Sequence, residues 1–211
     1  AESLRQVARD FATSPASMIF WGMGISQHIH GTDNARCLIS LALMCGHVGR
    51  PGTGLHPLRG QNNVQGASDA GLIPMFLPDY QSVTDENVRA KFGKIWGTDD
   101  IQKQAGLTVI EIMDAVHAGD VRGMYILGEN PAMSDPDVEH ARAALAKLDH
   151  LVVQDIFLTE TANYADVILP AAAWPEKTGT VTNTNRQGQM GRPAVSPPGE
   201  AREDWWIIVE I

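Results

Sequence analysis

Residues 56–71, with the sequence HPLRGQNNVQGASDAG, combine one arginine with an unusual density of side-chain amides and glycines. Arg59 is the only cation in this stretch, and the first acidic residue after it is Asp69. A guanidinium offers a planar fork of donors to a small anion. The amides carry both donors and acceptors, as a hydrogen-bond-rich heterocycle requires. The residues alone also allow a polar loop with Arg59 in a surface salt bridge, and composition favours that plainer reading. The amides are those of Gln61, Asn62, Asn63 and Gln65.

Polar turns that follow predicted strands are the next candidates. GMGISQ follows residues 18–21, GENPAMSD follows residues 124–127, and HLVVQDIF ends in Gln154 and Asp155. In parallel α/β sheets, ligands bind at the carboxyl ends of the strands. GMGISQ lacks the third glycine of a dinucleotide fingerprint, so each turn alone is weak support. The candidate side chains at these strand ends are Gln27, Asn130, Ser134, Gln154 and Asp155.

The carboxylate of Asp155 has two readings. An acceptor at that position suits the N–H donors of guanine or the hydroxyl groups of a ribose. It equally suits the cap of a turn or helix. The two acids of ETANYAD are explained by a solvated helix face.

Cys37 and Cys45 lie eight residues apart in one predicted helix, with no C-x-x-C spacing. This spacing excludes a disulfide framework or a cysteine-held cluster within the chain. We expect two core thiols in a reducing compartment. The histidines have no ligand spacing, so we expect loop or rim side chains and no metal site. They include His28, His30, His47 and His56.

Strands and helices alternate along the chain. This order predicts an α/β fold of dinucleotide-binding-like units, with parallel sheets and helices on both faces. Residues 32–49 predict a helix with Thr32 or Asp33 as N-cap and Gly46 or Gly49 as stop. Residues 50–80 show no sustained period and predict a long connection, which is typical of functional or disordered segments. The last part, rich in Thr, Asn, Gly and Pro, predicts a different packing environment.

Composition narrows the class of protein. The chain has 211 residues, 44% of them hydrophobic, and a formal net charge of −9. These values predict a folded protein and argue against nucleic acid or an anionic membrane as partner. No apolar run has membrane-spanning length, and no signal peptide opens the chain. The abrupt start AESLRQV and the helical end WWIIVEI predict a piece of a larger protein.

The motifs, taken together, resemble one known family. GMGISQHIHGTDNARCLISLALMCGHVGRPGTGLHPLRGQNNVQGASDAG is similar to catalytic (alpha) subunits of formate dehydrogenases in the molybdopterin oxidoreductase (dimethyl sulfoxide reductase) family. LGENPAMSDPD, VVQDIFLTETANYADVILPAAAWPEKTGTVTNTNRQ and GEAREDWWII continue the resemblance in order, over nearly the whole chain. RGQNNVQG is its most specific part, and TVTNTNRQ resembles soluble NAD-dependent, multi-subunit members.

The resemblance implies a Mo or W ion held by two molybdopterin guanine dinucleotides, and oxidation of formate to carbon dioxide. It implies that Arg59 orients the formate carboxylate and that Gln61 contacts the pterin. Asn130 stands where some relatives have an aspartate, which implies a weaker guanine or ribose contact. The implied contacts to one dinucleotide are Met23, Gly24 and Gln27, and those to the other are Gly128, Glu129, Asn130, Ser134, Gln154 and Asp155.

The resemblance also implies domain organisation and partners. Residues 1–62 would belong to one dinucleotide-binding domain, 63–173 to a second, and 174–211 to the start of a further segment. The cysteine or selenocysteine that ligates the metal and the 4Fe–4S clusters would lie outside this chain, which alone would be inactive. Partner subunits would carry iron–sulfur and flavin or NAD sites in the cytoplasm.

Two alternatives stay open at this point. One is a cofactor-free structural module like the large iron–sulfur subunit of NADH dehydrogenase. RGQNNVQG and the strand-end residues argue against it, because such a module has no need of Arg59 among amides. The other is a different reaction in the same family, such as nitrate reduction.

Overall fold

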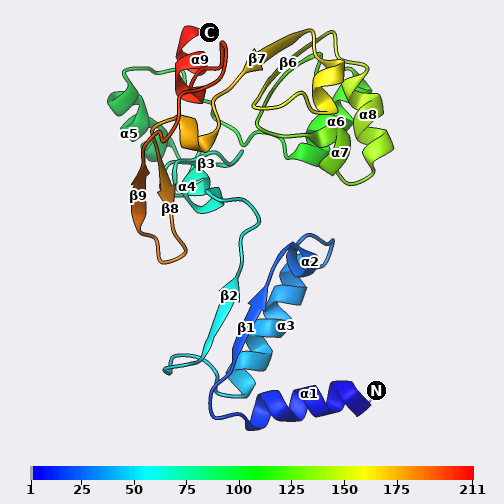
Figure 1. Cartoon of the computed structure of the whole chain (residues 1–211), viewed down its shortest axis with the longest axis vertical. Coiled ribbons are helices and arrows are strands. Elements are labelled where there is room, and N and C mark those ends of the chain that lie inside the picture. The colour runs from blue at the N-terminus through cyan, green and yellow to red at the C-terminus, as the bar shows by residue number, and fades with distance from the viewer. Residues whose placement is uncertain (1) are drawn as a thin grey trace. The chain divides into compact units, whose positions relative to one another are not determined.

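A computed structural model describes residues 2–211, which alternate helices with short strands (Figure 1). The chain divides into two compact units, one ending at Val64 and one running from Gln65 to Ile211. The first contains α1 (Glu2–Thr13), β1 (Met18–Trp21), α2 (Met23–Ser26), α3 (Gly31–Met44) and β2 (Gly54–Pro57). From α4 (Val64–Asp69) onwards the elements are β3 (Phe76–Leu77), β4 (Gln81–Ser82), α5 (Glu86–Trp96), α6 (Val109–Ala118), β5 (Gly123–Leu127), α7 (Pro131–Ser134), α8 (Val138–Leu145), β6 (His150–Asp155), η1 (Thr161–Tyr164), β7 (Val167–Pro170), η2 (Trp174–Glu176), β8 (Gly179–Thr182), β9 (Gly188–Gly191) and α9 (Asp204–Glu210).

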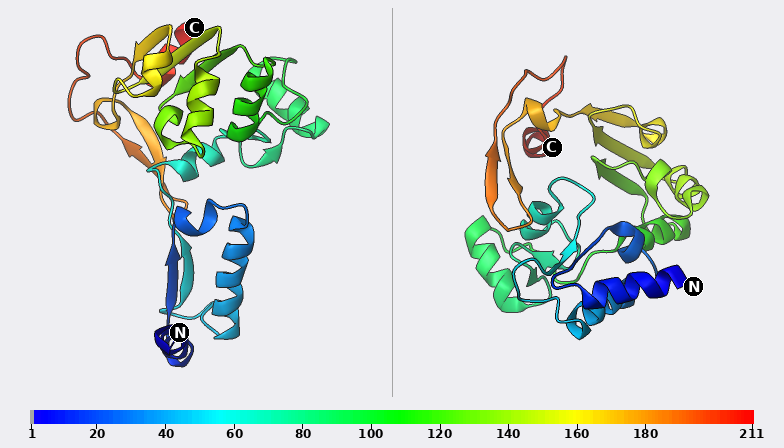
Figure 2. Two further views of the ribbon diagram at one scale, coloured as in Figure 1. Left: turned by 90° about the vertical axis from the view of Figure 1, so that its right-hand side faces the viewer. Right: turned by 60° about the horizontal axis from the view of Figure 1, so that its bottom comes forward.

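The first unit is a parallel strand–helix–strand unit. β1 and β2 pair in parallel, with Met18 opposite Gly54 and Trp21 opposite Pro57. Such a pair needs a crossover connection, which α2 and α3 supply. α3 lies along one face of the two strands (Figure 2).

The start of α3 differs from the predicted cap. The helix begins at Gly31 with His30 as N-cap, so the prediction of Thr32 or Asp33 is wrong. The hydrogen bond from Asn34 N to the backbone oxygen of His30, 2.9 Å long, starts the helix earlier than the sequence predicted. Close packing requires glycine at position 31, because a Cβ there would lie 1.9 Å from the backbone oxygen of Ser26. The helix ends at Met44, and Gly46 follows with φ of +69°, which confirms the predicted stop at Gly46.

The two cysteines are not both core thiols. Cys45 is half-buried, but Cys37 is exposed, so the prediction is wrong for Cys37. Cys37 shares the exposed side of α3 with Leu41 and Met44, four and seven residues further on. The buried side of the helix is marked by Ala42 instead.

His47 is buried, although we expected loop or rim histidines. Its side chain is 1% exposed, and its Nε2 lies 2.8 Å from the backbone oxygen of Phe11. The Phe11 ring meets the imidazole edge-on at 4.9 Å. Arg50 adds a contact to His47 Nδ1 and donates to the backbone oxygen of Gly46. This cluster holds the end of α1 against the end of α3.

Residues 50–80 are not one long irregular connection, as the sequence predicted. They contain β2, α4 and β3, each only two to six residues long. β2 has the sequence GLHP, and its glycine and proline are unfavourable in strands, so the sequence did not predict it. Pairing with β1 stabilises this strand. The short antiparallel pair of β3 and β4 follows, with Phe76 opposite Ser82.

The second unit is built on a three-stranded parallel sheet in the order β5-β6-β7. Tyr125 lies opposite Val152, and Val153 lies opposite Ile168. α6, α7 and α8 pack together beside this sheet (Figure 1). These parallel sheets confirm the predicted α/β class. The core of the unit consists of Met113, Val116, Ile126, Ala132, Ala144, Leu145, Leu151, Val153 and Ala162.

A chain of polar side chains ties the C-terminal helix α9 to this sheet. The Tyr125 hydroxyl donates to Gln154 Oε1, and Gln154 Nε2 donates to Asp204 Oδ1 at 2.8 Å. Asp204 also forms an ion pair with Lys177. Burial, together with the nearby Asp204 carboxylate, raises the pKa of Tyr125 above its usual range.

The remaining strands, β8 and β9, form an antiparallel hairpin with Thr180 opposite Met190. Its turn includes Arg186 with φ of +64°. None of the described helices is both long and apolar enough to cross a membrane. The division into cofactor-binding domains at residues 62/63 and 173/174 stays a prediction.

Candidate functional site

The first group of predicted residues lies at the carboxyl ends of β1 and β2. Met23, Gly24 and Gln27 follow β1 in or just after α2, and Arg59 and Gln61 follow β2. Because β1 and β2 are parallel, both turns emerge at the same edge of the pair. The hydrogen bond from Leu58 N to the backbone oxygen of Trp21, 2.7 Å long, holds the two strand ends together.

The α2 turn is fixed by contacts within the first unit. Asn34 Nδ2 donates to the backbone oxygen of Ile25 at 3.0 Å, and His28 Nε2 lies 2.7 Å from the backbone oxygen of Gly24. A Cβ placed on Gly60 would lie 3.9 Å from Met23 Cγ. The structure therefore brings the arginine turn beside Met23. The side chains of Arg59, Gln61 and Gln27 are exposed.

The second group lies at the carboxyl ends of β5 and β6. Gly128 ends β5 with φ of +65°, a left-handed conformation that favours glycine. Its N–H donates to the backbone oxygen of Gln154 at 2.9 Å, so the two strand ends are joined here as well. This group belongs to the second unit and the Arg59 group belongs to the first.

An apolar pocket of about 470 Å³ lies beside this second edge. Glu129 and Asp135 contribute its carboxylates, and Tyr125, Met124 and Leu127 contribute apolar surface. Burial raises the pKa of Asp135, and the negative charge of Glu129 raises it further. A carboxyl group of this kind retains its proton to higher pH than an exposed aspartate.

Asp155 caps its own turn. Its Oδ1 accepts from the backbone N–H groups of Ile156 at 2.6 Å and of Phe157 at 3.3 Å. The capping interpretation therefore has direct geometric support for one carboxylate oxygen. A contact from the other oxygen to a guanine or ribose stays a prediction.

Gln154 is fully buried, and both ends of its amide are used within the protein. Its Oε1 accepts from Tyr125 and its Nε2 donates to Asp204. The geometry therefore gives Gln154 a structural role between β5 and α9. Its predicted contact to a dinucleotide is not supported by the position of its side chain, and stays a prediction.

Asn130 and Ser134 bracket α7. The Ser134 hydroxyl donates to the backbone oxygen of Asn130 at 3.1 Å. The Asn130 amide reaches instead to Glu160 and Thr161, which the sequence did not single out. The two acids of ETANYAD were the available signal; both are exposed, and each also accepts a hydrogen bond within the protein. Glu160 accepts from Asn130, and Asp166 accepts from Leu151 N at 2.8 Å.

One buried hydroxyl near this edge has no partner. Thr159 Oγ1 is the side-chain oxygen or nitrogen, among the described residues, that is buried without a hydrogen bond. Leaving such a group unpaired is costly unless a ligand or another polar group satisfies it. Thr159 lies between Asp155 and Thr161, in the segment that follows β6.

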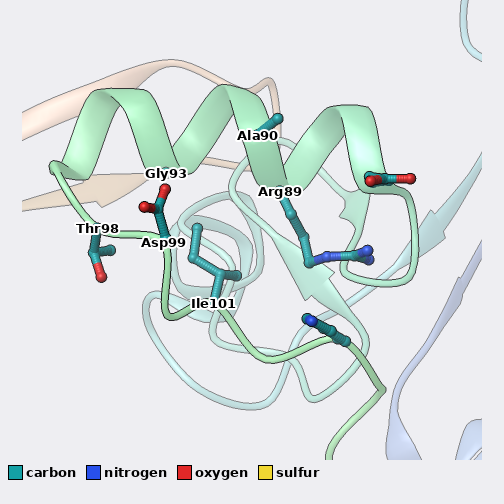
Figure 3. A pocket seen from close by; sticks show the side chains of 8 residues that line it. Arg89, Ala90, Gly93, Thr98, Asp99 and Ile101 are labelled. Carbon is teal, nitrogen blue, oxygen red and sulfur yellow. The ribbon is translucent and has the colours of Figure 1, made fainter.

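A separate pocket of about 310 Å³ lies beside α5 in the second unit (Figure 3). Arg89 and Lys103 supply positive charge, and Glu86 and Asp99 supply equal negative charge. Arg89 Nη1 donates to the backbone oxygen of Val83 at 2.8 Å, which gives this side chain a structural role. None of the predicted site residues lines this pocket.

Within residues 2–211, no group of three or more histidine, cysteine, aspartate or glutamate side chains could hold a metal ion. Any metal bound near these residues would need ligands from another group. The two strand-end edges instead offer backbone turns, amides, carboxylates and one arginine. Those groups suit a polar organic ligand and a small anion.

Comparisons with known proteins place this arrangement in a family. The F420-dependent formate dehydrogenase subunit alpha of Methanocaldococcus jannaschii is 49% identical over 210 residues, which cover all of this chain and 31% of that protein. Formate dehydrogenase H of Escherichia coli is 42% identical over 211 residues, or 30% of its length. The chain thus spans about a third of these relatives.

Acetylene hydratase from Pelobacter acetylenicus has a similar fold, with a TM-score of 0.62, 20% identity, and coverage of 98% of this chain and 31% of that one. The description "Molybdopterin oxidoreductase" belongs to the family model that matches residues 3–211. This match takes in nearly the whole chain and confirms the resemblance seen in its motifs. The chain belongs to the molybdopterin oxidoreductase family.

Proposed function

We propose that this chain is part of a formate dehydrogenase catalytic subunit that binds a bis-(molybdopterin guanine dinucleotide) cofactor with Mo or W. The observation that carries the proposal is the place of Arg59, exposed in the turn that follows β2 and beside the Met23 turn. The names of relatives 42% to 49% identical over the whole chain support the same reaction.

Three features of the second unit fit a dinucleotide. Gly128 has a left-handed backbone, and a Cβ built on it would meet nothing within 4 Å, which leaves room for a ligand near the backbone. Thr159 Oγ1 is a buried hydroxyl oxygen with no hydrogen-bond partner among the described residues. Asp155 and Glu129 place acceptors at the same edge, as guanine and ribose donors require. In the proposal, Gly128, Glu129, Ser134 and Asp155 hold this dinucleotide.

The first unit would hold the second dinucleotide through Met23, Gly24 and Gln27, with Gln61 against the pterin. Arg59 would bind the formate carboxylate through two parallel N–H donors. This contact fixes the orientation of formate and neutralises its charge before carbon dioxide is formed. The cofactor, when bound, supplies the acceptor for the two electrons that formate loses.

The test uses the full-length protein with an Arg59→Lys substitution. Lysine keeps the charge but loses the fork, so kcat/KM for formate with an artificial dye should fall about 100-fold or more. Metal and pterin content should stay unchanged. Arg36→Lys, an exposed arginine on α3 paired with Asp33, is the matched control and should leave turnover unaltered.

Normal formate turnover by Arg59→Lys would contradict the proposed role. So would a protein that lost its metal and pterin together with activity, because the arginine would then be structural. Absence of pterin and metal from the wild-type protein would favour the cofactor-free module. Dye-coupled nitrate reduction without formate oxidation would favour another reaction of the family.

The electron acceptor has two candidates. NAD is proposed from the resemblance of TVTNTNRQ to NAD-dependent enzymes in which iron–sulfur and flavin subunits accept the electrons. F420 is the second candidate, since the Methanocaldococcus jannaschii relative is named F420-dependent. Formate oxidation assayed with each acceptor in turn separates them.

A further inference from the structure

Helix α1 lies across the end of α3 and buries none of its own residues (Figure 1). Leu4 and Val7 are exposed on it, whereas Phe11, one turn further on, is half-buried and meets the His47 ring. His47 Nε2 lies 2.8 Å from the backbone oxygen of Phe11, in the last turn of α1. The helix is therefore attached near its carboxyl-terminal end.

Arg50 strengthens this attachment. Its Nη1 donates to the backbone oxygen of Pro15 at 3.1 Å, just after α1, and its Nε donates to the backbone oxygen of Gly46 at 2.9 Å, just after α3. These two bonds hold the guanidinium in place, with Nη2 at 3.4 Å from His47 Nδ1. We refer to His47, Arg50 and the three backbone oxygens that they bind as the α1 latch.

The partners in the α1 latch determine where the hydrogen of the imidazole lies. A carbonyl oxygen only accepts, so Nε2 carries the hydrogen and donates it to the backbone oxygen of Phe11. A guanidinium only donates, so Nδ1 faces Arg50 with its lone pair. The latched ring is therefore neutral, with its hydrogen on Nε2.

A second proton on this ring would break the α1 latch. It would lie on Nδ1 and point at the Arg50 guanidinium, which offers no acceptor and carries the same charge. The His47 side chain is 1% exposed, so water does not solvate the charged ring in place. Release of the ring into water removes both costs.

The other charged side chains near this joint are directed elsewhere. On α1, Asp10 accepts from Gln6 at 2.8 Å, and Arg9 forms an ion pair with Glu2. The carboxyl-terminal half of α3 has no charged residue. Among the residues that the structure describes, no carboxylate forms an ion pair with His47, as carboxylates do with two histidines of the second unit. A charged ring would therefore have no compensating partner.

We propose that His47 is a proton-sensitive switch, which holds α1 on the end of α3 while its ring is neutral and releases α1 when the ring takes up a second proton. A histidine in water takes up that proton near about pH 6.5. The released ring binds one proton more than the latched ring, so falling pH favours release. The inference uses contacts within the first unit alone and does not depend on the proposed function.

The experiment compares the full-length wild type with His47→Gln and His30→Gln. Hydrogen exchange is followed by mass spectrometry between about pH 5 and pH 8, which spans the titration of histidine. One peptide covers residues 2–14, and rates are corrected for the intrinsic pH dependence of exchange. A second peptide, covering β6, reports unfolding of the whole protein. Glutamine keeps an N–H donor for the oxygen of Phe11 but does not titrate.

In the wild type, exchange in residues 2–14 should rise about five- to twentyfold from pH 8 to pH 5, because release takes up one proton. Exchange in β6 should stay constant. His47→Gln should change less than about twofold over the same range. His30 is exposed in the same unit, so His30→Gln is the matched control and should behave like the wild type.

A second measurement on the wild type keeps the proposal testable if His47→Gln does not fold. Diethyl pyrocarbonate modifies accessible neutral imidazoles, and His47 and His30 are compared in one digest. The ratio of labelling at His47 to labelling at His30 should rise about three- to fourfold from pH 8 to pH 6, because release then exposes His47 more often.

Equal exchange in residues 2–14 at both ends of the pH range would overturn the proposal for the wild type. A rise that persists in His47→Gln would also overturn it, because another group would then be the sensor. A parallel rise in β6 would show acid unfolding of the whole protein instead of release of α1. A labelling ratio that is independent of pH would refute the switch when His47→Gln does not fold.

Discussion

The turns after β1 and after β5 have the same place in their parallel sheets but different support. In the second unit, the turn after β5 adjoins a buried core that includes Leu145 and Leu151, and a side-chain hydrogen bond joins it to η1, which follows β6. In the first unit, α1 has no buried residue, and α3 buries Gly31 and Ala42 alone.

This difference shows two ways to support a strand-end edge that is proposed to bind a ligand. The second unit arranges its edge with its own side chains, so a ligand would meet turns that are already ordered. The first unit presents Arg59 and Gln61 on exposed turns with little apolar burial behind them. We infer that ligand binding would order the first edge more than the second.

Removal of core volume gives the largest expected contrast. Leu145 on α8 is 1% exposed, so Leu145→Ala should lower the free energy of unfolding by about 2–5 kcal/mol. Leu43 on α3 is 60% exposed, and Leu43→Ala should change it by about 0.5 kcal/mol or less. Urea-induced unfolding of the full-length protein measures both. Equal losses would show that other parts of the full-length protein cover Leu43, and the contrast would fail.

The glycines at the two strand ends give a smaller contrast. Gly128 has φ of +65°, so Gly128→Ala should destabilise the protein by about 1–2 kcal/mol. Gly22 has φ of −122° and free space where a Cβ would lie. Gly22→Ala should therefore be neutral or slightly stabilising. Shifts in the melting temperature report both changes, and a cost at Gly22 equal to that at Gly128 would contradict the conformational argument.

The smallest expected effect concerns the pH dependence of the second edge. The pKa of Asp135 is raised above its ordinary value of 3.8, mainly by burial and further by Glu129. The folded protein therefore binds this proton more tightly than the unfolded chain. The stabilisation is present below about pH 4 and is lost as the pH rises through the raised pKa.

Asp135→Asn removes this titration. Melting temperatures are measured between about pH 3 and pH 7. As the pH rises, the free energy of unfolding of the variant should increase relative to that of the wild type, by about 0.5 kcal/mol or less. Glu129→Gln should lower the pKa of Asp135 and reproduce a minor part of the effect, because burial is the larger cause. A variant whose stability falls relative to the wild type as the pH rises would contradict the predicted direction of the effect.

Much of the strand framework could be predicted from the sequence. Both ends of the strand Met18–Trp21 were predicted correctly, because its apolar residues are followed directly by glycine. The short elements within residues 50–80 could not be predicted in the same way. β2, for example, contains glycine and proline, and it is a strand because it pairs with β1. The sequence likewise gave no sign that Asn130 would bond to Glu160, since no local period relates residues that far apart. The role of Asp155 could not be decided from the sequence, because one carboxylate can cap a turn with one oxygen and contact a ligand with the other.

The polar chain from Tyr125 through Gln154 to Asp204 has a consequence for how the protein is made. Gln154 and Asp204 are 50 residues apart, so a ribosome adding about 5–20 residues per second delivers Asp204 about 3–10 s after Gln154. During that delay the β5–β6 strand pair can form, but the Gln154 amide lacks the acceptor that it has in the finished protein. Completion of the second unit therefore waits for α9 to leave the ribosomal exit tunnel, and pausing of translation between these two codons would prolong exposure of a half-satisfied sheet.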